Sequence, residues 1–141
     1  MFRKLHLCYV PLCLSLVLII GCSAQKDIGA ASAAVVQFHQ RLDNQDYLAI
    51  YNGADQRFRG ASKQDDFVAL MTAIHNKLGT VQQASRQGFF FNYNTSGSTI
   101  KLTYATKFSG GDADEEFLWS KRGDNFLLLG YHINSNSLIT K

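Results

Sequence analysis

The chain has 141 residues, the size of one small domain. Its 14 Lys and Arg residues outnumber its 11 Asp and Glu residues, and the formal net charge is +3. No run of basic residues carries interleaved aromatics, and so weak a field argues against nucleic-acid binding. The three cysteines, Cys8, Cys13 and Cys22, all lie near the N-terminus, so the rest of the chain has no thiol for a disulfide or a metal site.

Residues 1–21 have the pattern of a cleavable signal peptide. Arg3 and Lys4 form a basic start, an apolar stretch follows, and the small residue Gly21 precedes the predicted cut. The stretch contains Pro11 and is shorter than the roughly 20 apolar residues that a membrane-spanning helix needs. We therefore predict that this segment is removed, which lowers the formal net charge to +3 − 2 = +1.

The stretch Leu18–Cys22, Leu-Ile-Ile-Gly-Cys, resembles the lipobox of bacterial lipoproteins, although two isoleucines replace the commoner residues before the glycine. The resemblance implies that Cys22 carries a lipid anchor, so that membrane lipid is an expected partner. Ser23 follows the cysteine in place of Asp, which in bacteria with two membranes implies export to the outer membrane, facing the periplasm. The alternatives are an uncleaved anchor, or an ordinary signal peptide in which Cys22 has no role.

Two helices are expected at the start of the mature chain. Residues 22–29 are short, polar and glycine-containing, which predicts a tether, and the folded domain then covers residues 30–141. A helix beginning near Ala30 or Ser32 places an apolar stripe at helical spacing, formed by Ala31, Ala34, Val35, Phe38 and Leu42. Asn44 is the expected cap of a short second helix over residues 47–51.

The clearest predicted helix follows a less regular connection over residues 54–61. Ser62, with Asp65 three residues later, resembles a capping box and predicts that Ser62 caps this helix. Gly79 is the expected stop. The buried stripe is expected to comprise Phe67, Leu70, Met71, Ile74 and Leu78.

After Gly79 the hydrophobic pattern alternates, which predicts four strands over residues 81–93, 99–108, 114–121 and 126–133, with a bulge near Gly88. Short turns between them predict an antiparallel meander. Helices followed by strands define an α+β domain whose helices pack on one face of the sheet. Alternation assigns to the core a set without carboxylate or histidine: Phe89, Phe91, Tyr93, Ile100, Leu102, Tyr104, Phe117, Trp119, Leu127, Leu129, Tyr131 and Ile133.

Several stretches resemble small bacterial lipoproteins that carry a domain of unknown function. These stretches are Phe38–Leu42, Tyr47–Tyr51, Leu78-Gly79, Asn92–Asn94 and Gly130–Ser135. The order of elements also resembles the nuclear-transport-factor-2-like and cystatin-like α+β folds. These resemblances imply a fold but no activity, because the wider superfamily includes ketosteroid isomerase and dehydratases as well as many non-catalytic domains.

Two functions are compatible with this fold. The favoured one is a non-enzymatic envelope lipoprotein whose domain is an interaction or assembly module. The alternative is a small-ligand-binding or isomerase- or dehydratase-like domain with an aromatic pocket between sheet and helices, lined by Tyr47, Tyr51, Tyr104, Trp119 and Tyr131. Asp46 and Asp55 are acids near the second helix, for which capping is the simpler role. No catalytic residue, cofactor or metal site is predicted, and His39 and His75 lack a ligand spacing.

The sheet face opposite the helices mixes polar with apolar residues. Alternation places Phe90, Leu118, Leu128 and His132 on it, and we predict that they adjoin as a patch. The expected partner is a second copy, through a two-fold contact, or another envelope protein. The alternatives are scattered surface apolar residues, which are normal, or partial cover by the tether or the C-terminal tail.

Overall fold

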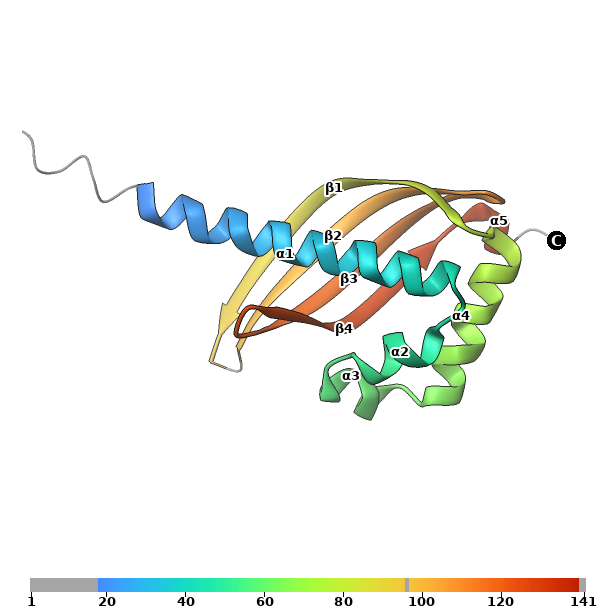
Figure 1. Ribbon diagram of the computed structural model, residues 1–141, viewed down its shortest axis with the longest axis horizontal. Helices are drawn as coiled ribbons and strands as arrows, with labels where there is room; N and C mark the ends of the chain where they lie inside the picture. The colour runs from blue at the N-terminus through green and yellow to red at the C-terminus, as the bar shows by residue number, and fades with distance from the viewer. Residues whose placement is uncertain (1–17, 96, 140–141) are drawn as a thin grey trace, which may run out of the picture.

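The computed structural model describes residues 18–95 and 97–139. The elements are α1 (Leu18–Asp43), α2 (Tyr47–Asn52), α3 (Gln56–Ala61), α4 (Gln64–Leu78), β1 (Val81–Asn94), β2 (Gly97–Phe108), β3 (Gly111–Arg122), β4 (Asn125–Asn134) and α5 (Asn136–Ile139). The sheet order is β1-β2-β3-β4, and each neighbouring pair is antiparallel. Figure 1 shows α1 crossing the strands, with α2 to α4 beside it. The predicted α+β meander is therefore confirmed.

Residues 1–17, which make up most of the predicted signal peptide, and the side chain of Cys22 lie outside the described residues. Helix α1 begins at Leu18, well before the start expected at Ala30 or Ser32. Ile28 is buried, Lys26 pairs with Asp124 of the β3–β4 turn at 3.2 Å, and Asp27 pairs with Lys121 at 2.6 Å. Residues 23–29 are thus helical and docked on the sheet, in place of the tether we expected. No helix within the described ranges is long and apolar enough to cross a membrane.

The core lies between α1 and the sheet. The side chains of α1 that face the sheet repeat at helical spacing and are all buried: Ile28, Ala31, Val35, Phe38 and Leu42. Phe117 of β3 lies at the centre of the core, with its ring 5.1 Å from that of Phe38. Burying an aromatic ring of this size stabilises a fold by about 1.5–3 kcal/mol, so this contact helps to hold α1 on the sheet.

The caps of the short helices differ from those predicted. Asp46, not Asn44, caps α2, since its carboxylate accepts from the N–H of Ala49 at 3.4 Å. The connection over residues 54–61 contains α3, which is capped by Asp55. Both acids therefore have the capping role that the sequence favours.

Helix α4 also differs in two details. Lys63 is its N-cap, without a side-chain bond, because Ser62 ends α3 instead of capping α4. Leu70 is 47% exposed, so the prediction that it is buried is wrong. The buried stripe of this helix is formed by Phe67, Met71, Ile74 and Leu78. At 100° per residue, Leu70 lies at the margin of this stripe. Gly79 ends the helix with φ 75°, as predicted.

Of the three register shifts in the sheet, two bear on the predicted faces of β1 and β4. The one predicted near Gly88 is confirmed, because the register of β1 on β2 shifts between Arg86 and Gly88. The second was not predicted: Leu118 pairs with Gly130 whereas Trp119 pairs with Leu128. This shift reverses the alternation of β4, so Leu128 is buried in the core and the expected core residues Leu127 and Leu129 are only partly buried.

Candidate functional site

A cluster of buried polar side chains surrounds Glu115, which is 2% exposed. Its Oε2 accepts from the Thr106 hydroxyl at 2.5 Å and lies 2.8 Å from His39 Nε2. Its Oε1 accepts from the Tyr131 hydroxyl at 2.7 Å. This Glu115 cluster (His39, Thr106, Glu115 and Tyr131) therefore links α1 to β2, β3 and β4.

The Glu115 cluster corrects the prediction of a core without carboxylate or histidine. Strand β3 begins at Gly111, so Glu115 lies inside the strand, on the same face as Phe117, and not at its end. His39 follows Val35 by four residues and precedes Leu42 by three, and that helical spacing was a signal in the sequence for its burial.

The chemistry of the Glu115 cluster is that of a closed network. A carboxylate beside an imidazole is an arrangement that acid–base catalysis uses. Here the Glu115 side chain is 0% exposed and that of His39 is 7% exposed, so a substrate has no approach. Burial raises the pKa of Tyr131 well above 10, and the charge of Glu115 adds to this, so Tyr131 stays protonated as a donor. The cluster thus holds helix and sheet together.

The residues predicted to line an aromatic pocket do not surround one cavity. Tyr104, Trp119 and Tyr131 pack around Phe117, at ring distances of 5.9, 5.9 and 5.1 Å respectively. These rings are in direct contact and fill the space that we expected a ligand to occupy.

The other two members of the predicted pocket lie on α2. Tyr47 and Tyr51 are both buried, and the Tyr51 hydroxyl donates to the carbonyls of Arg59 and Ser62, at 3.2 and 2.8 Å. A cavity of about 60 Å³ lies where α1 and α2 meet the sheet, and Trp119 lines it. Ligand pockets typically measure about 300–1,000 Å³, whereas one water occupies about 30 Å³. The cavity is therefore too small for a substrate.

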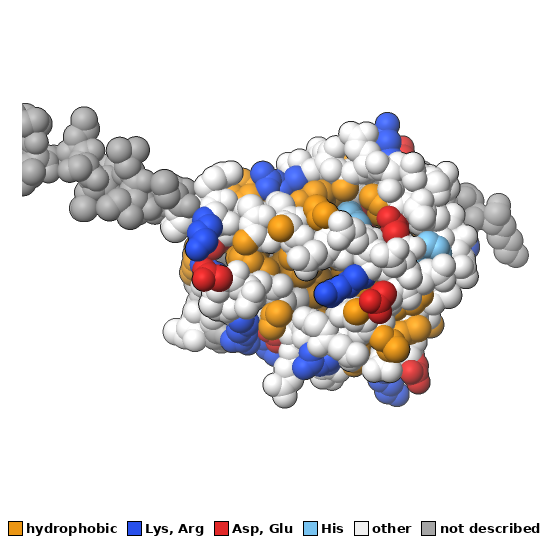
Figure 2. Space-filling view, in the orientation of Figure 1, with side chains coloured by type: hydrophobic (Ala, Val, Ile, Leu, Met, Phe, Trp, Pro, Cys, Tyr) orange, Lys and Arg blue, Asp and Glu red, His pale blue; other side chains and the backbone are white. Residues whose placement is uncertain are grey.

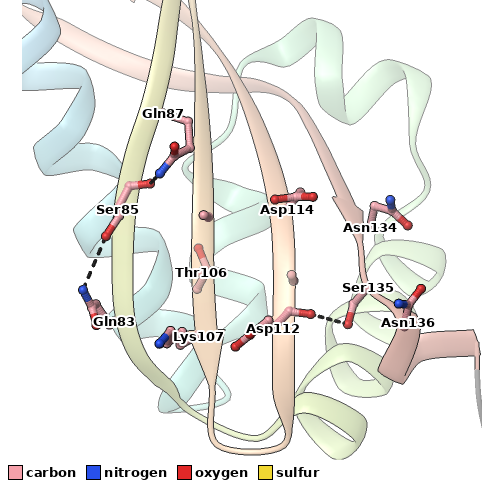
Figure 3. A pocket seen from close by; sticks show the side chains of 12 residues that line it. Gln83, Ser85, Gln87, Thr106, Lys107, Asp112, Asp114, Asn134, Ser135 and Asn136 are labelled. Carbon is pink, nitrogen blue, oxygen red and sulfur yellow. Dashed lines mark hydrogen bonds between the residues drawn. The ribbon is translucent and has the colours of Figure 1, made fainter.

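A larger polar groove of about 550 Å³ lies on the open face of the sheet (Figure 3). Gln83, Ser85, Lys107, Asp112 and Asp114 are among the residues that line it. Part of its polar lining is already bonded, because the Gln83 amide donates to Ser85 at 3.5 Å. No group of three or more His, Cys, Asp or Glu side chains in the described ranges is arranged to hold a metal ion.

The predicted patch of Phe90, Leu118, Leu128 and His132 is not formed as expected. Leu128 points into the core because of the bulge in β4 and is only 3% exposed. Lys101 lies between Phe90 and Leu118 across the strands, and it pairs with Glu116 at 3.1 Å. Leu118 is half-buried and packs over Gly130. Phe90 and His132 are exposed, but they do not share a continuous apolar surface.

The exposed aromatic residues gather on β1 instead. Phe89, Phe90 and Tyr93 are 55%, 63% and 65% exposed, and Phe91 is partly buried. Phe89, Phe91 and Tyr93 form a ladder on the helix side, with ring centroids 5.9 and 5.7 Å apart. Phe90 lies on the open face. We call these four residues the β1 aromatic edge.

The position of β1 explains why the prediction of a buried Phe89 and Tyr93 is wrong. Phe89 pairs with the buried Leu102, so it does lie on the helix side of the sheet. However, the start of α1 contacts the β3–β4 turn through Lys26 and leaves this end of β1 uncovered. Alternation thus identified the correct face, but it carries no information on how far the helices cover that face.

The two edges of the sheet differ in how they are closed. Strand β1 is outermost, and no described strand pairs with its outer side (Figure 1). At β4, the N–H of Asp55 donates to the carbonyl of Leu128 at 2.8 Å, so the α3 segment covers part of that edge. Figure 2 shows one side of the molecule, on which hydrophobic side chains form small groups among polar ones. The β1 aromatic edge is therefore the best candidate for a functional surface.

These features define a small α+β domain with a filled core and one open aromatic edge. No family model matches the chain, and no curated protein is significantly similar to it. A function must therefore be argued from the geometry of this chain alone.

Proposed function

We propose that this protein is a non-enzymatic lipoprotein of the cell envelope that works as an interaction module through the β1 aromatic edge. In this proposal, lipid on Cys22 holds the mature chain to a membrane. In a host with two membranes, this is the outer membrane, and the chain faces the periplasm. The proposal includes the relationship to small lipoproteins with a domain of unknown function, and to nuclear-transport-factor-2-like and cystatin-like folds, that the sequence resemblances imply.

The observation that carries the proposal is the exposure of three large aromatic side chains along an open edge strand. Single exposed apolar residues are normal, but contiguous apolar surface usually marks a binding site. From Gln87 to Asn94 the strand carries no charge and no proline, two of the features that otherwise protect an edge from pairing with another chain. An aromatic-core ligand site is less well supported, since the cavity there measures only about 60 Å³.

The anchor is tested by replacing Cys22 with Ala in the full chain. We expect the wild-type protein in the membrane fraction and the variant in the soluble fraction. Equal membrane association of the two proteins would overturn the lipid anchor. This result would leave the interaction surface to be judged separately.

The interaction surface is tested by a photo-crosslinking residue placed at position 90 in cells. The matched control carries the same residue at His132, which is also exposed on the open face but lies on β4. We expect a crosslinked protein product from position 90 and little from position 132. Similar yields from the two positions, or none from position 90, would overturn the role of β1.

A further inference from the structure

We propose that the partner of the β1 aromatic edge is a second copy of this chain, paired antiparallel through β1 about a two-fold axis at Phe90. This inference rests on the interaction function proposed above and specifies its partner. It joins two four-stranded sheets into one, with the helices of both copies on the same face, because a two-fold axis perpendicular to the sheet preserves its faces. The outer side of each edge strand, with which no described strand pairs, then gains a partner.

The sequence around Phe90 is self-complementary in this pairing. Phe90 faces Phe90 of the second copy on the open face, and Phe89 faces Phe91 in both directions on the helix side. Directly opposite aromatic residues are favourable cross-strand pairs. Gly88 meets Asn92, and so the segment between the bulge and the turn matches itself residue by residue.

The charges of β1 are compatible with this register. Arg86 is the only charged residue of the strand, and it lies beyond the bulge, outside the segment from Gly88 to Asn92 that pairs with itself. Arg86 also donates to the Ser32 hydroxyl at 2.9 Å, which holds its guanidinium toward α1. No like charges therefore meet across the contact, although like charges directly opposite would disfavour it.

The exposed area is sufficient for a two-fold contact. An aromatic side chain can bury about 150–250 Å². With Phe89, Phe90 and Tyr93 55%, 63% and 65% exposed, the three leave roughly 350 Å² per copy, or about 700 Å² in two copies. Phe91 and the backbone of the edge strand bring the total near the 1,000 Å² or so that a specific interface needs.

Disulfide trapping tests the register in a full chain whose Cys8, Cys13 and Cys22 are replaced by Ser. Phe90→Cys places two thiols on the axis, where opposite Cα atoms lie about 4.5–5.5 Å apart, within reach of a disulfide. Asn92→Cys is the matched control on the same strand and face, because its two copies lie about 13 Å apart. We expect an oxidised dimer from Phe90→Cys and none from Asn92→Cys. Equal crosslinking of the two variants would overturn the register.

Sedimentation equilibrium over a concentration series tests the dimer without a cysteine at the interface. The cysteine-free chain should have twice the monomer mass, and Phe90→Glu, which places two carboxylates opposite each other, should be monomeric with an unchanged circular dichroism spectrum. A monomer at every concentration, or a dimer that survives Phe90→Glu, would overturn the second-copy proposal. A crosslink from position 90 to a different protein in cells would also overturn it, but would leave the interaction function intact.

Discussion

Replacing Asp55 with Ala should destabilise the domain strongly, because one buried carboxylate serves several partners. It caps α3 through the Arg57 N–H at 2.9 Å and accepts from the Ser120 hydroxyl of β3 at 2.5 Å. Loss of a cap costs about 0.5–2 kcal/mol. Leaving the hydroxyl of Ser120, a residue that is 1% exposed, without its acceptor costs about 1–3 kcal/mol more. The ion pairs with Arg57 and Arg122 add little, because the two arginine side chains are about half exposed.

These contributions together predict a loss of about 1.5–5 kcal/mol, which a urea titration at neutral pH would register as a fall of roughly 1–2.5 M in the unfolding midpoint. Asp46→Ala is the matched control, since Asp46 also caps a helix but is exposed and its bond to Ala49 is 3.4 Å long. That variant should lose about 0.5 kcal/mol or a little more. If the two variants lost equal stability, the link from α3 to β3 would have no special energetic role.

Four further results follow from the same structure. The hydrogen bonds from Arg57 and Ser120 hold the pKa of Asp55 well below its usual range. The contribution of Asp55 to stability is therefore present above about pH 4 and is lost as pH falls through the folded pKa. In acid titrations the stability of Asp55→Asn should depend less steeply on pH than that of the wild type, and an equal slope would contradict this. Burial raises the pKa of Tyr131, so stability should fall as pH rises above about 10. Tyr131→Phe should weaken this pH dependence. An unchanged slope in the variant would assign the pH dependence to other groups. In a urea titration, Ile74→Ala should lower the free energy of unfolding by about 2–5 kcal/mol and Leu70→Ala by less than about 1 kcal/mol, because only Ile74 is buried. The reverse order would show that α4 is rotated from its position here. Leu128→Glu should unfold the monomer by circular dichroism whereas Phe90→Glu should not, because only Leu128 is buried; a folded Leu128→Glu protein would place Leu128 on the surface.

The sequence predicts most of the fold because its hydrophobic periods are clear. The stripe from Ala31 to Leu42 and the alternation of Ile100, Leu102 and Tyr104 follow directly from the geometry of helices and strands. The bulge in β4 could not be predicted in this way. It depends on how β4 pairs with β3, and a shift of one residue moves Leu128 from the surface to the core.

The candidate site was harder to predict for a related reason. Phe89 and Tyr93 have the parity of core residues, and only the path of α1 across the sheet decides that they are exposed. Glu115 and His39 are distant in the chain, so their contact at 2.8 Å has no local signature. Periodicity identifies the face of an element, whereas tertiary packing determines which part of that face is covered.

The proposed role of the β1 aromatic edge is binding and not folding. It is tested most directly by the crosslinking yield from position 90, in cells, of a chain that carries Phe89→Ser and Tyr93→Ser. The matched control carries Val36→Ser and Leu48→Ser, since these residues are 54% and 49% exposed and lie on α1 and α2, outside the β1 aromatic edge. We predict that the first chain loses its crosslink while it folds normally by circular dichroism, and that the control retains the wild-type yield. A yield unchanged in the first chain, or lost equally in both, would contradict the account.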